Sequence, residues 1–358
     1  MKRLLFLLAA FAPVLALCDA PSDPAAAFRI LLRANSDTIV SLPLHRPALV
    51  EASLQTRTGN QLELSDDIPA LPVEGAYLLV MSGSLEGAVL PVTALVSRTL
   101  TVTPGTYDLS TLHTESADGL AEGAIVAVIP YWTLDTVFPA GAGVQASTDP
   151  LTIKTQVLMF NDSVVGINRS ASAVYFYYAG DGYYSAGWYC QGDFSATRGT
   201  TRLPPNHYFM VRHPVGSNTE LILTGSVQLS GQRIPVGTIQ SSRAQDNLLS
   251  IPVPVPVTLD ASGLNASDAF TATTDILTVK DKLLIFDNTT TGKNKSASAV
   301  YFYFAGDGFY SAGWYRFGDF SQTVGTVSLK PGEGFIIRKA AIITPATNTW
   351  TLVPSYLQ

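Results

Sequence analysis

Short runs in which apolar and polar residues alternate dominate the chain from Phe28 onward. Successive side chains of a β-strand point to opposite faces, so this alternation indicates half-buried strands. Gly, Pro, Asn and Asp separate the runs, and no amphipathic helical pattern persists for three turns. The pattern therefore predicts an all-β protein.

Two hairpins are predicted near the start of this β-rich region. Residues 48–64 form two extended arms around Thr58-Gly59-Asn60, a sequence typical of a tight turn. A second hairpin is predicted from residues 77–80 and 89–94, with its turn within residues 83–87. Further strands are expected at residues 100–102 and 124–129. Together these elements indicate a small N-terminal β-barrel or β-sandwich.

The chain contains a long internal duplication. Residues 170–195 are SASAVYFYYAGDGYYSAGWYCQGDFS, and residues 296–321 are SASAVYFYFAGDGFYSAGWYRFGDFS. The offset is 126 residues, and only four of the 26 positions differ. Weaker similarity extends the repeated unit to residues 148–225 and 274–355. Each unit has the length of a β-domain of about seven or eight strands, or of half of one pseudo-symmetric domain.

These patterns predict a fold in which a small N-terminal β-barrel or sandwich precedes a duplicated antiparallel β-sandwich or barrel region. A short similarity lies outside the repeats, since residues 246–252 (DNLLSIP) echo residues 37–43 (DTIVSLP). The predicted divisions are a signal peptide (1–18), an N-terminal β-module (28–136), a linker (137–147), a first β-repeat (148–239), a connector (240–273) and a second β-repeat (274–358).

The first residues have the form of a secretory signal peptide. Met1-Lys2-Arg3 supplies the positive start, and the apolar run that follows is too short to span a bilayer. The mature chain is therefore expected in the periplasm, at the cell surface or outside the cell. Lipid anchoring at Cys18 is the less favoured alternative, because Leu17 is large where a lipoprotein box has a small residue. No later apolar stretch approaches 18 residues, so no transmembrane segment is expected in the mature chain.

The charge of the chain argues against a nucleic-acid partner. Charged residues make up 14% of the sequence, against about 25% in a typical protein. Without Lys2 and Arg3 the chain has 20 basic and 28 acidic residues, a net charge of −8, and no basic cluster. Phosphate neutralisation requires grouped Lys and Arg, so nucleic-acid binding is disfavoured.

Motifs of common enzymes are absent from the sequence. Residues 182–187 (GYYSAG) are one residue too long for the Gly-x-Ser-x-Gly nucleophile elbow. None of the histidines has zinc-site spacing, and the spacing of Asp and Glu selects no acid/base pair. The four histidines are His45, His113, His207 and His213. We therefore predict no catalytic residue, no metal site and no cofactor, with His207 and His213 at the surface.

The duplicated hairpin is the strongest candidate for a binding site. Trp and Tyr could stack on the apolar face of a sugar, and Asp could accept hydrogen bonds from its hydroxyls. The candidate ligand-binding residues are Tyr175, Tyr177, Asp181, Trp188 and Asp193 in the first copy and Tyr301, Tyr303, Asp307, Trp314 and Asp319 in the second. The favoured alternative is structural, with Trp in the core and Asp in the turns, because tight β-turns select Gly and Asp without any ligand.

Two further features of the hairpin bear on its role. A calcium site is less favoured, because Asp181 and Asp193 are 12 residues apart with no acidic residue between them. Tyr and Phe exchange between the copies at positions 178/304 and 183/309, so the hydroxyl is dispensable there. Burial is the simpler role at both pairs of positions.

Several stretches resemble an uncharacterised family of exported bacterial all-β proteins with duplicated aromatic and glycine-rich modules. The residues that carry the resemblance are 37–43, 82–87 (SGSLEG), 129–134 (IPYWTL), 284–288 (LIFDN), Asn294-Lys295-Ser296, 332–338 and 350–356. The resemblance implies bacterial export, and the family has no established activity, ligand or catalytic residue. The first copy has Asn206-His207-Tyr208-Phe209 where the second has Gly-Glu-Gly-Phe, which indicates a different role for this loop.

The sequence thus predicts an exported, non-catalytic structural or interaction protein of the cell surface or extracellular space. The first alternative is a carbohydrate-binding module that uses the duplicated Trp, Tyr and Asp residues. A glycan-active hydrolase is a distant third. The expected partners are cell-surface polysaccharide or other envelope proteins.

Overall fold

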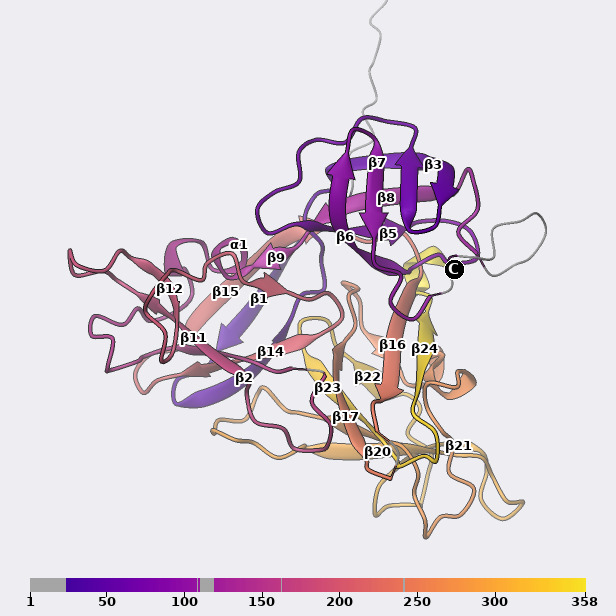
Figure 1. Ribbon diagram of the computed structural model, residues 1–358. Helices are drawn as coiled ribbons and strands as arrows, with labels where there is room; N and C mark the ends of the chain where they lie inside the picture. Colours follow the sequence, from indigo (N-terminus) through magenta and orange to yellow (C-terminus); the bar gives the residue numbers. More distant parts are fainter. Residues whose placement is uncertain (1–23, 108, 110–118, 162, 241) are drawn as a thin grey trace, which may run out of the picture.

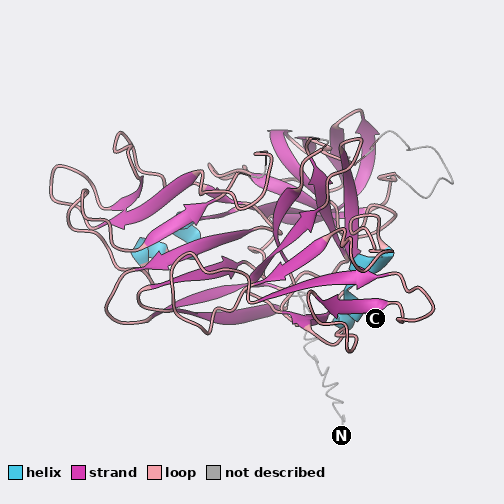
Figure 2. Ribbon diagram, turned by 90° about the horizontal axis from the view of Figure 1, so that it is seen from below, coloured by secondary structure: helices cyan, strands magenta, loops and turns pink. Residues whose placement is uncertain are grey.

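The computed structural model describes residues 24–107, 109, 119–161, 163–240 and 242–358, and strands dominate it (Figures 1 and 2). The prediction of an all-β protein is confirmed. The short helical segments are α1 (Leu134–Val137), η1 (Pro139–Gly141), η2 (Asp260–Ser262), η3 (Leu264–Ala266) and η4 (Ser355–Leu357).

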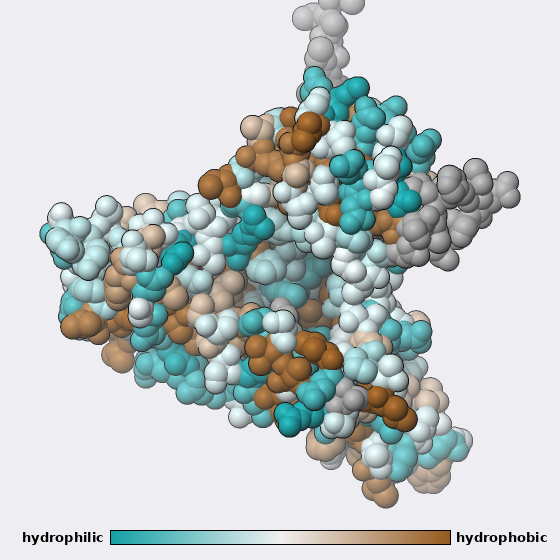
Figure 3. Space-filling model, viewed as in Figure 1, coloured by the Kyte–Doolittle hydropathy of each residue, from teal (hydrophilic) through white to brown (hydrophobic). Residues whose placement is uncertain are grey.

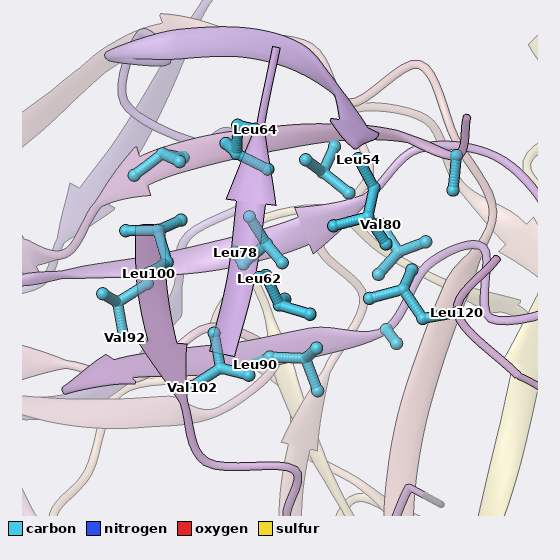
Figure 4. Close-up of a cluster of buried hydrophobic side chains, with 14 of the residues drawn as sticks. Leu54, Leu62, Leu64, Leu78, Val80, Leu90, Val92, Leu100, Val102 and Leu120 are labelled. Carbon is cyan, nitrogen blue, oxygen red and sulfur yellow. The ribbon is translucent and has the colours of Figure 1, made fainter. Parts of the chain in front are cut away.

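Six strands close into a barrel in the order β3-β4-β7-β6-β5-β8. Their bounds are β3 (Val50–Thr58), β4 (Gln61–Leu64), β5 (Ala76–Val80), β6 (Val89–Val96), β7 (Thr99–Val102) and β8 (Ile125–Pro130). Both predicted hairpins, β3–β4 and β5–β6, are present. Side chains that alternate inward along the strands fill the barrel, and Leu62, Leu78 and Leu100 among them are fully buried (Figure 4).

The rest of the chain forms two units that each contain a five-stranded antiparallel sheet with the same strand order. The first unit has the order β12-β11-β10-β14-β2, and the second has β21-β20-β19-β23-β17. The first sheet consists of β12 (Gly187–Cys190), β11 (Ala173–Tyr178), β10 (Gln156–Met159), β14 (Tyr208–His213) and β2 (Ser36–Ser41). The second consists of β21 (Gly313–Arg316), β20 (Ala299–Phe304), β19 (Lys282–Ile285), β23 (Gly334–Lys339) and β17 (Gln245–Ser250).

Two strand pairs complete each unit, again in matching positions. In the first unit β1 (Ala25–Leu32) pairs with β15 (Thr219–Ser226), and β9 (Trp132–Thr133) pairs with β13 (Arg202–Leu203). In the second unit β16 (Gln232–Thr238) pairs with β24 (Ala346–Leu352), and β18 (Val257–Thr258) pairs with β22 (Ser328–Leu329). Strands β1, β2 and β9 therefore correspond to β16, β17 and β18, and the barrel lies in the chain between β2 and β9.

This pairing accounts for the similarity of residues 37–43 and 246–252, because the two segments lie in the corresponding strands β2 and β17. The range 28–136 thus supplies strands to the first unit as well as the barrel, and the range 240–273 contains β17 and β18 of the second. The expected linker, residues 137–147, is packed into the fold, since Phe138 and Ser147 are fully buried.

The two units contact each other through β2 and β14 of the first and β17 and β23 of the second. A small apolar cluster joins them, to which Ile39 and Tyr208 contribute from the first unit and Leu248 and Ile336 from the second. The first unit extends to the left in Figure 1 and the second to the lower right, with the barrel above their junction.

A hydrogen-bonded clasp borders this cluster. Asp37 in β2 is 1% exposed and accepts two hydrogen bonds from the Arg212 guanidinium of its own unit, at 2.7 and 2.8 Å. The backbone N–H of Asn294, in the second unit, donates to the same carboxylate at 2.6 Å. The Asn294 side-chain oxygen accepts from Arg212 at 2.6 Å. One carboxylate thus joins groups from both units.

The same clasp occurs a second time with the roles of the units exchanged. Asp246 in β17 is 1% exposed and accepts from Arg338 of its own unit at 2.7 and 3.0 Å. The backbone N–H of Asn168, in the first unit, donates to Asp246 at 2.8 Å, and the Asn168 side chain accepts from Arg338 at 2.7 Å. Such reciprocity is the pattern of a two-fold interface, here within one chain.

The contribution of the clasp to the free energy of unfolding can be tested by substitution. Replacement of Asp246 by Ala should lower the free energy of unfolding by about 3–5 kcal/mol, because Arg338 would stay partly buried without its carboxylate. Replacement of the exposed Asp67 by Ala is the matched control and should change it by less than about 0.5 kcal/mol. Urea unfolding followed by tryptophan fluorescence measures both, and coincident curves for the two variants would contradict the assigned role of the clasp.

Candidate functional site

The duplicated aromatic hairpins lie at the outer edge of each five-stranded sheet, away from the contact between the units. Strands β11 and β12 form the first hairpin, in which Tyr177 pairs with Trp188. Strands β20 and β21 form the second, in which Tyr303 pairs with Trp314. Figure 1 places the two hairpins far apart, one near the end of each unit.

Both hairpin tryptophans are fully buried. Trp188 packs on Phe138, with ring centroids 5.4 Å apart, and Trp314 packs on Phe270 at 5.0 Å. Tyr177 and Tyr303 meet the two tryptophans edge-on, at 5.7 and 5.5 Å. The tryptophans therefore belong to the cores of the units and present no surface on which a sugar could stack.

The other candidate tyrosines are also part of the hairpin scaffold. Tyr175 is half-buried and packs against the core of the first unit, and Tyr301 is buried in that of the second. Tyr189 and Tyr315, which keep their hydroxyl in both copies, donate to the carbonyl oxygens of Ser185 and Ser311. These phenols stabilise the hairpins from within.

The carboxylates at the hairpin tips hold the turns together. Asp181 accepts the backbone N–H groups of Tyr183 and Tyr184, each at 2.8 Å. Asp307 does the same for Phe309 and Tyr310, at 2.9 and 2.8 Å. The bonds from Tyr184 and Tyr310, followed by those from Tyr183 and Phe309, lower the pKa of Asp181 and Asp307. Both side chains are therefore ionised and engaged at neutral pH.

The second pair of candidate carboxylates closes the loops after the hairpins. Asp193 accepts from the hydroxyl and backbone N–H of Ser195 and pairs with Arg198 at 2.5 Å. Asp319 accepts the same two bonds from Ser321. The Ser hydroxyls, followed by the backbone bonds, lower the pKa of both carboxyls. All four predicted carboxylates thus have partners within their own loops.

The prediction of burial at the Tyr/Phe exchange positions is correct for one pair and wrong for the other. Tyr178 and Phe304 are each 1% exposed, whereas Tyr183 and Phe309 are each 85% exposed. The reason lies in the turn, because the Asp carboxylates bind the backbone at 183 and 309 and leave the rings outside. Each exposed ring packs edge-on against the next residue, Tyr184 or Tyr310, with centroids 4.8 Å apart.

A second exposed apolar residue lies at the same end of each unit. Leu151 is 90% exposed and Leu277 91%, and they are again 126 residues apart. Asp149 and Asp275 hold these turns by accepting the N–H groups of Leu151 and Leu277, each at 2.9 Å. Hydrophobic side chains reach the surface at the outer ends of both units in Figure 3.

In each unit, the turn that carries the exposed leucine and the turn that carries the exposed aromatic ring begin at neighbouring positions of the sheet. The Ala179 N–H donates to the Ser147 carbonyl at 2.9 Å, just before each turn begins, and Ala305 and Thr273 repeat the bond. We call Leu151 with Tyr183 the first contact end, and Leu277 with Phe309 the second. Neither contact end was identified from the sequence alone. A usable signal was present, because an Asp that occurs in both copies of the repeat lies two residues before each exposed side chain.

No metal site emerges within the described ranges, which hold no group of three or more His, Cys, Asp or Glu side chains suited to a metal ion. The prediction that His213 is a surface residue is wrong. The inward alternation of β14 buries it completely, and it bonds to Thr155 at 3.0 Å. Burial lowers the pKa of His213. Lys339, its counterpart, is also buried and pairs with Asp281.

Among the described residues no helix is long and apolar enough to cross a membrane. Comparisons of the chain with protein-family models, curated proteins and solved structures found no match. The fold and the site therefore define an all-β protein with an N-terminal barrel and several aromatic clusters.

The hairpin offers a matched pair of aromatic truncations. Replacement of Trp188 by Ala should lower the free energy of unfolding by about 3–5 kcal/mol, because it empties a fully buried site. Replacement of Tyr183 by Ala on the same hairpin should change it by less than about 0.5 kcal/mol. Thermal or urea unfolding measures both, and a curve for the Trp188 variant that superimposes on wild type would refute the core assignment.

Proposed function

We propose that this chain is an exported, non-catalytic interaction protein of the cell surface or extracellular space, which bridges two copies of one partner through its two contact ends. The observation that carries the proposal is the repetition of exposed apolar side chains. Leu151, Tyr183, Leu277 and Phe309 are 85–91% exposed at equivalent positions of the two units. Single exposed apolar residues are ordinary on proteins, but a matched pair repeated in two units favours contact with a partner.

The contact ends are organised before any partner binds. Four carboxylates hold the turns that carry the exposed side chains, and buried aromatic clusters lie beneath the tips. An aromatic side chain on a rigid turn contributes contact area at a low cost in conformational entropy. This arrangement supports recognition of a surface by fixed apolar anchors.

Two ends on one scaffold allow bivalent binding. The clasps join the units, so a partner held at the first contact end raises the effective concentration of its copy at the second. Avidity of this kind exceeds the affinity of one end by about 10²–10⁴ without any new contact. A protein with a bridging role in the cell envelope gains from this property.

Other observations support the non-catalytic and exported parts of the proposal. The hairpin carboxylates are engaged in turns and loops, and His213 is buried. The basic and apolar start of the chain supports export, as does its resemblance to an uncharacterised family of exported bacterial proteins. The burial of Trp188 and Trp314 gives no support to the carbohydrate-binding alternative.

Retention on an immobilised envelope fraction from the producing cells tests the proposal. The Leu151→Ser/Tyr183→Ser and Leu277→Ser/Phe309→Ser variants should each be retained about 100-fold less than wild type, because each keeps one end and loses avidity. The variant with all four changes should fall to background.

The control replaces two apolar residues of similar exposure outside the contact ends. Val73 and Ile343 are 84% and 97% exposed, and a Val73→Ser/Ile343→Ser variant should be retained like wild type. Equal retention of wild type and the fourfold variant would overturn the proposal.

A further inference from the structure

A cavity of about 320 Å³ lies where the barrel and the two repeat units meet. Val89 and Tyr107 reach it from the barrel, Asn206 and His207 from the β13–β14 loop of the first unit, and Ile234 and Leu249 from β16 and β17 of the second. The surface in Figure 3 is hollowed beneath the barrel. This volume falls within the range of small-ligand pockets, about 300–1,000 Å³.

The cavity wall is mainly apolar. Val89 of the barrel and Ile234, Leu248 and Leu249 of the second unit contribute apolar side chains to it. Burial raises the pKa of Tyr107 to about 12, and its hydroxyl donates to the Arg233 carbonyl at 3.1 Å. The Arg233 guanidinium reaches out of the wall to the carbonyl oxygens of Glu86 and Ser84 in the barrel. Such a wall suits an uncharged, largely apolar molecule.

One polar group of the wall lacks a protein partner. Asn206 is 7% exposed, and its side-chain oxygen accepts no hydrogen bond from the described residues. An unpaired buried acceptor costs about 1–3 kcal/mol. A ligand that donates a hydrogen bond to this oxygen would remove that cost.

The fold does not require a side chain at this position. Asn206 has a φ of 64°, in the left-handed region, and its counterpart Gly332 has a φ of 76°. Glycine adopts this conformation most readily, so the second unit shows that the loop closes without the amide. Both loops also make the same bonds across the interface, from Ser250 N–H to the Asn206 carbonyl and from Ser41 N–H to the Gly332 carbonyl.

The corresponding cleft beside Gly332 has a different character. It measures about 200 Å³, and its lining includes three charged residues, Arg29, Arg33 and Glu333, beside the apolar Phe28, Ile30 and Leu31. The larger cleft beside Asn206 has a mainly apolar lining in which Arg233 is the one residue with a full charge, and the barrel supplies one side of it. The two copies of one cleft have therefore diverged, as the sequence difference at residues 206–209 indicated.

We propose that the cavity beside Asn206 binds a small, uncharged and mainly apolar molecule with one hydroxyl or N–H group, which donates a hydrogen bond to the Asn206 side-chain oxygen. The site is separate from both contact ends and does not depend on the bridging function. A bound molecule touches the barrel and both units at once.

A pair of probes tests the proposal on the intact protein. 1-Naphthol has the required hydroxyl, and 1-methylnaphthalene has a similar shape without a donor. Asn206→Gly places the residue of the second unit at a φ that suits it. This change should weaken 1-naphthol binding about tenfold, the equivalent of 1.4 kcal/mol, and should alter 1-methylnaphthalene binding by less than about twofold.

A second variant locates the site. Val89→Phe extends a ring into the cavity from the barrel side and should weaken both probes at least about tenfold, with the melting temperature showing that the variant is folded. Titration followed by ligand-observed NMR measures the dissociation constants. Three outcomes would overturn the proposal: neither probe binds wild type, Asn206→Gly affects both probes alike, or folded Val89→Phe binds both unchanged.

Discussion

The arrangement of this protein depends on two buried carboxylates that each draw partners from both units. Asp37 and Asp246 are removed from water, so their charges require hydrogen-bonded partners. Each unit supplies one arginine to its own aspartate and one asparagine loop to the other unit's aspartate. Neither clasp is complete in one unit alone, so the duplicated halves stabilise each other as an internal two-fold pair.

The two copies of the duplicated sequence are similar in one part of the structure and different in another. At the outer ends the two copies stay alike, with buried tryptophans below and the exposed pairs Leu151/Tyr183 and Leu277/Phe309 above. Beside the interface the copies differ, because the barrel closes only the cleft that contains Asn206. Similarity at the ends favours repeated contact with one kind of partner, and divergence at the clefts favours one small-molecule site.

The short-range sequence patterns correctly predicted those features of the fold that depend on neighbouring residues in the chain. The hairpin at Thr58-Gly59-Asn60 followed from its turn sequence and flanking alternation, and the strand-rich class from the spacing of turns. The pairing of β2 with β14 joins residues on either side of the barrel, so no local pattern could reveal it. The favoured alternative placed Trp188 in the core, and the structure confirms it. The exposure of Tyr183 escaped prediction, because the turn binds its backbone N–H to Asp181 and leaves the ring outside.

If the clasps hold the contact ends at one fixed separation, this separation can be measured directly. Spin labels would be attached at Leu151→Cys and Leu277→Cys in a chain whose Cys18 and Cys190 are Ser, and their separation measured by double electron–electron resonance. With both clasps intact we expect one narrow distance distribution, which broadens when Asp37 and Asp246 are both replaced by Asn. A broad distribution with both clasps intact would contradict this expectation.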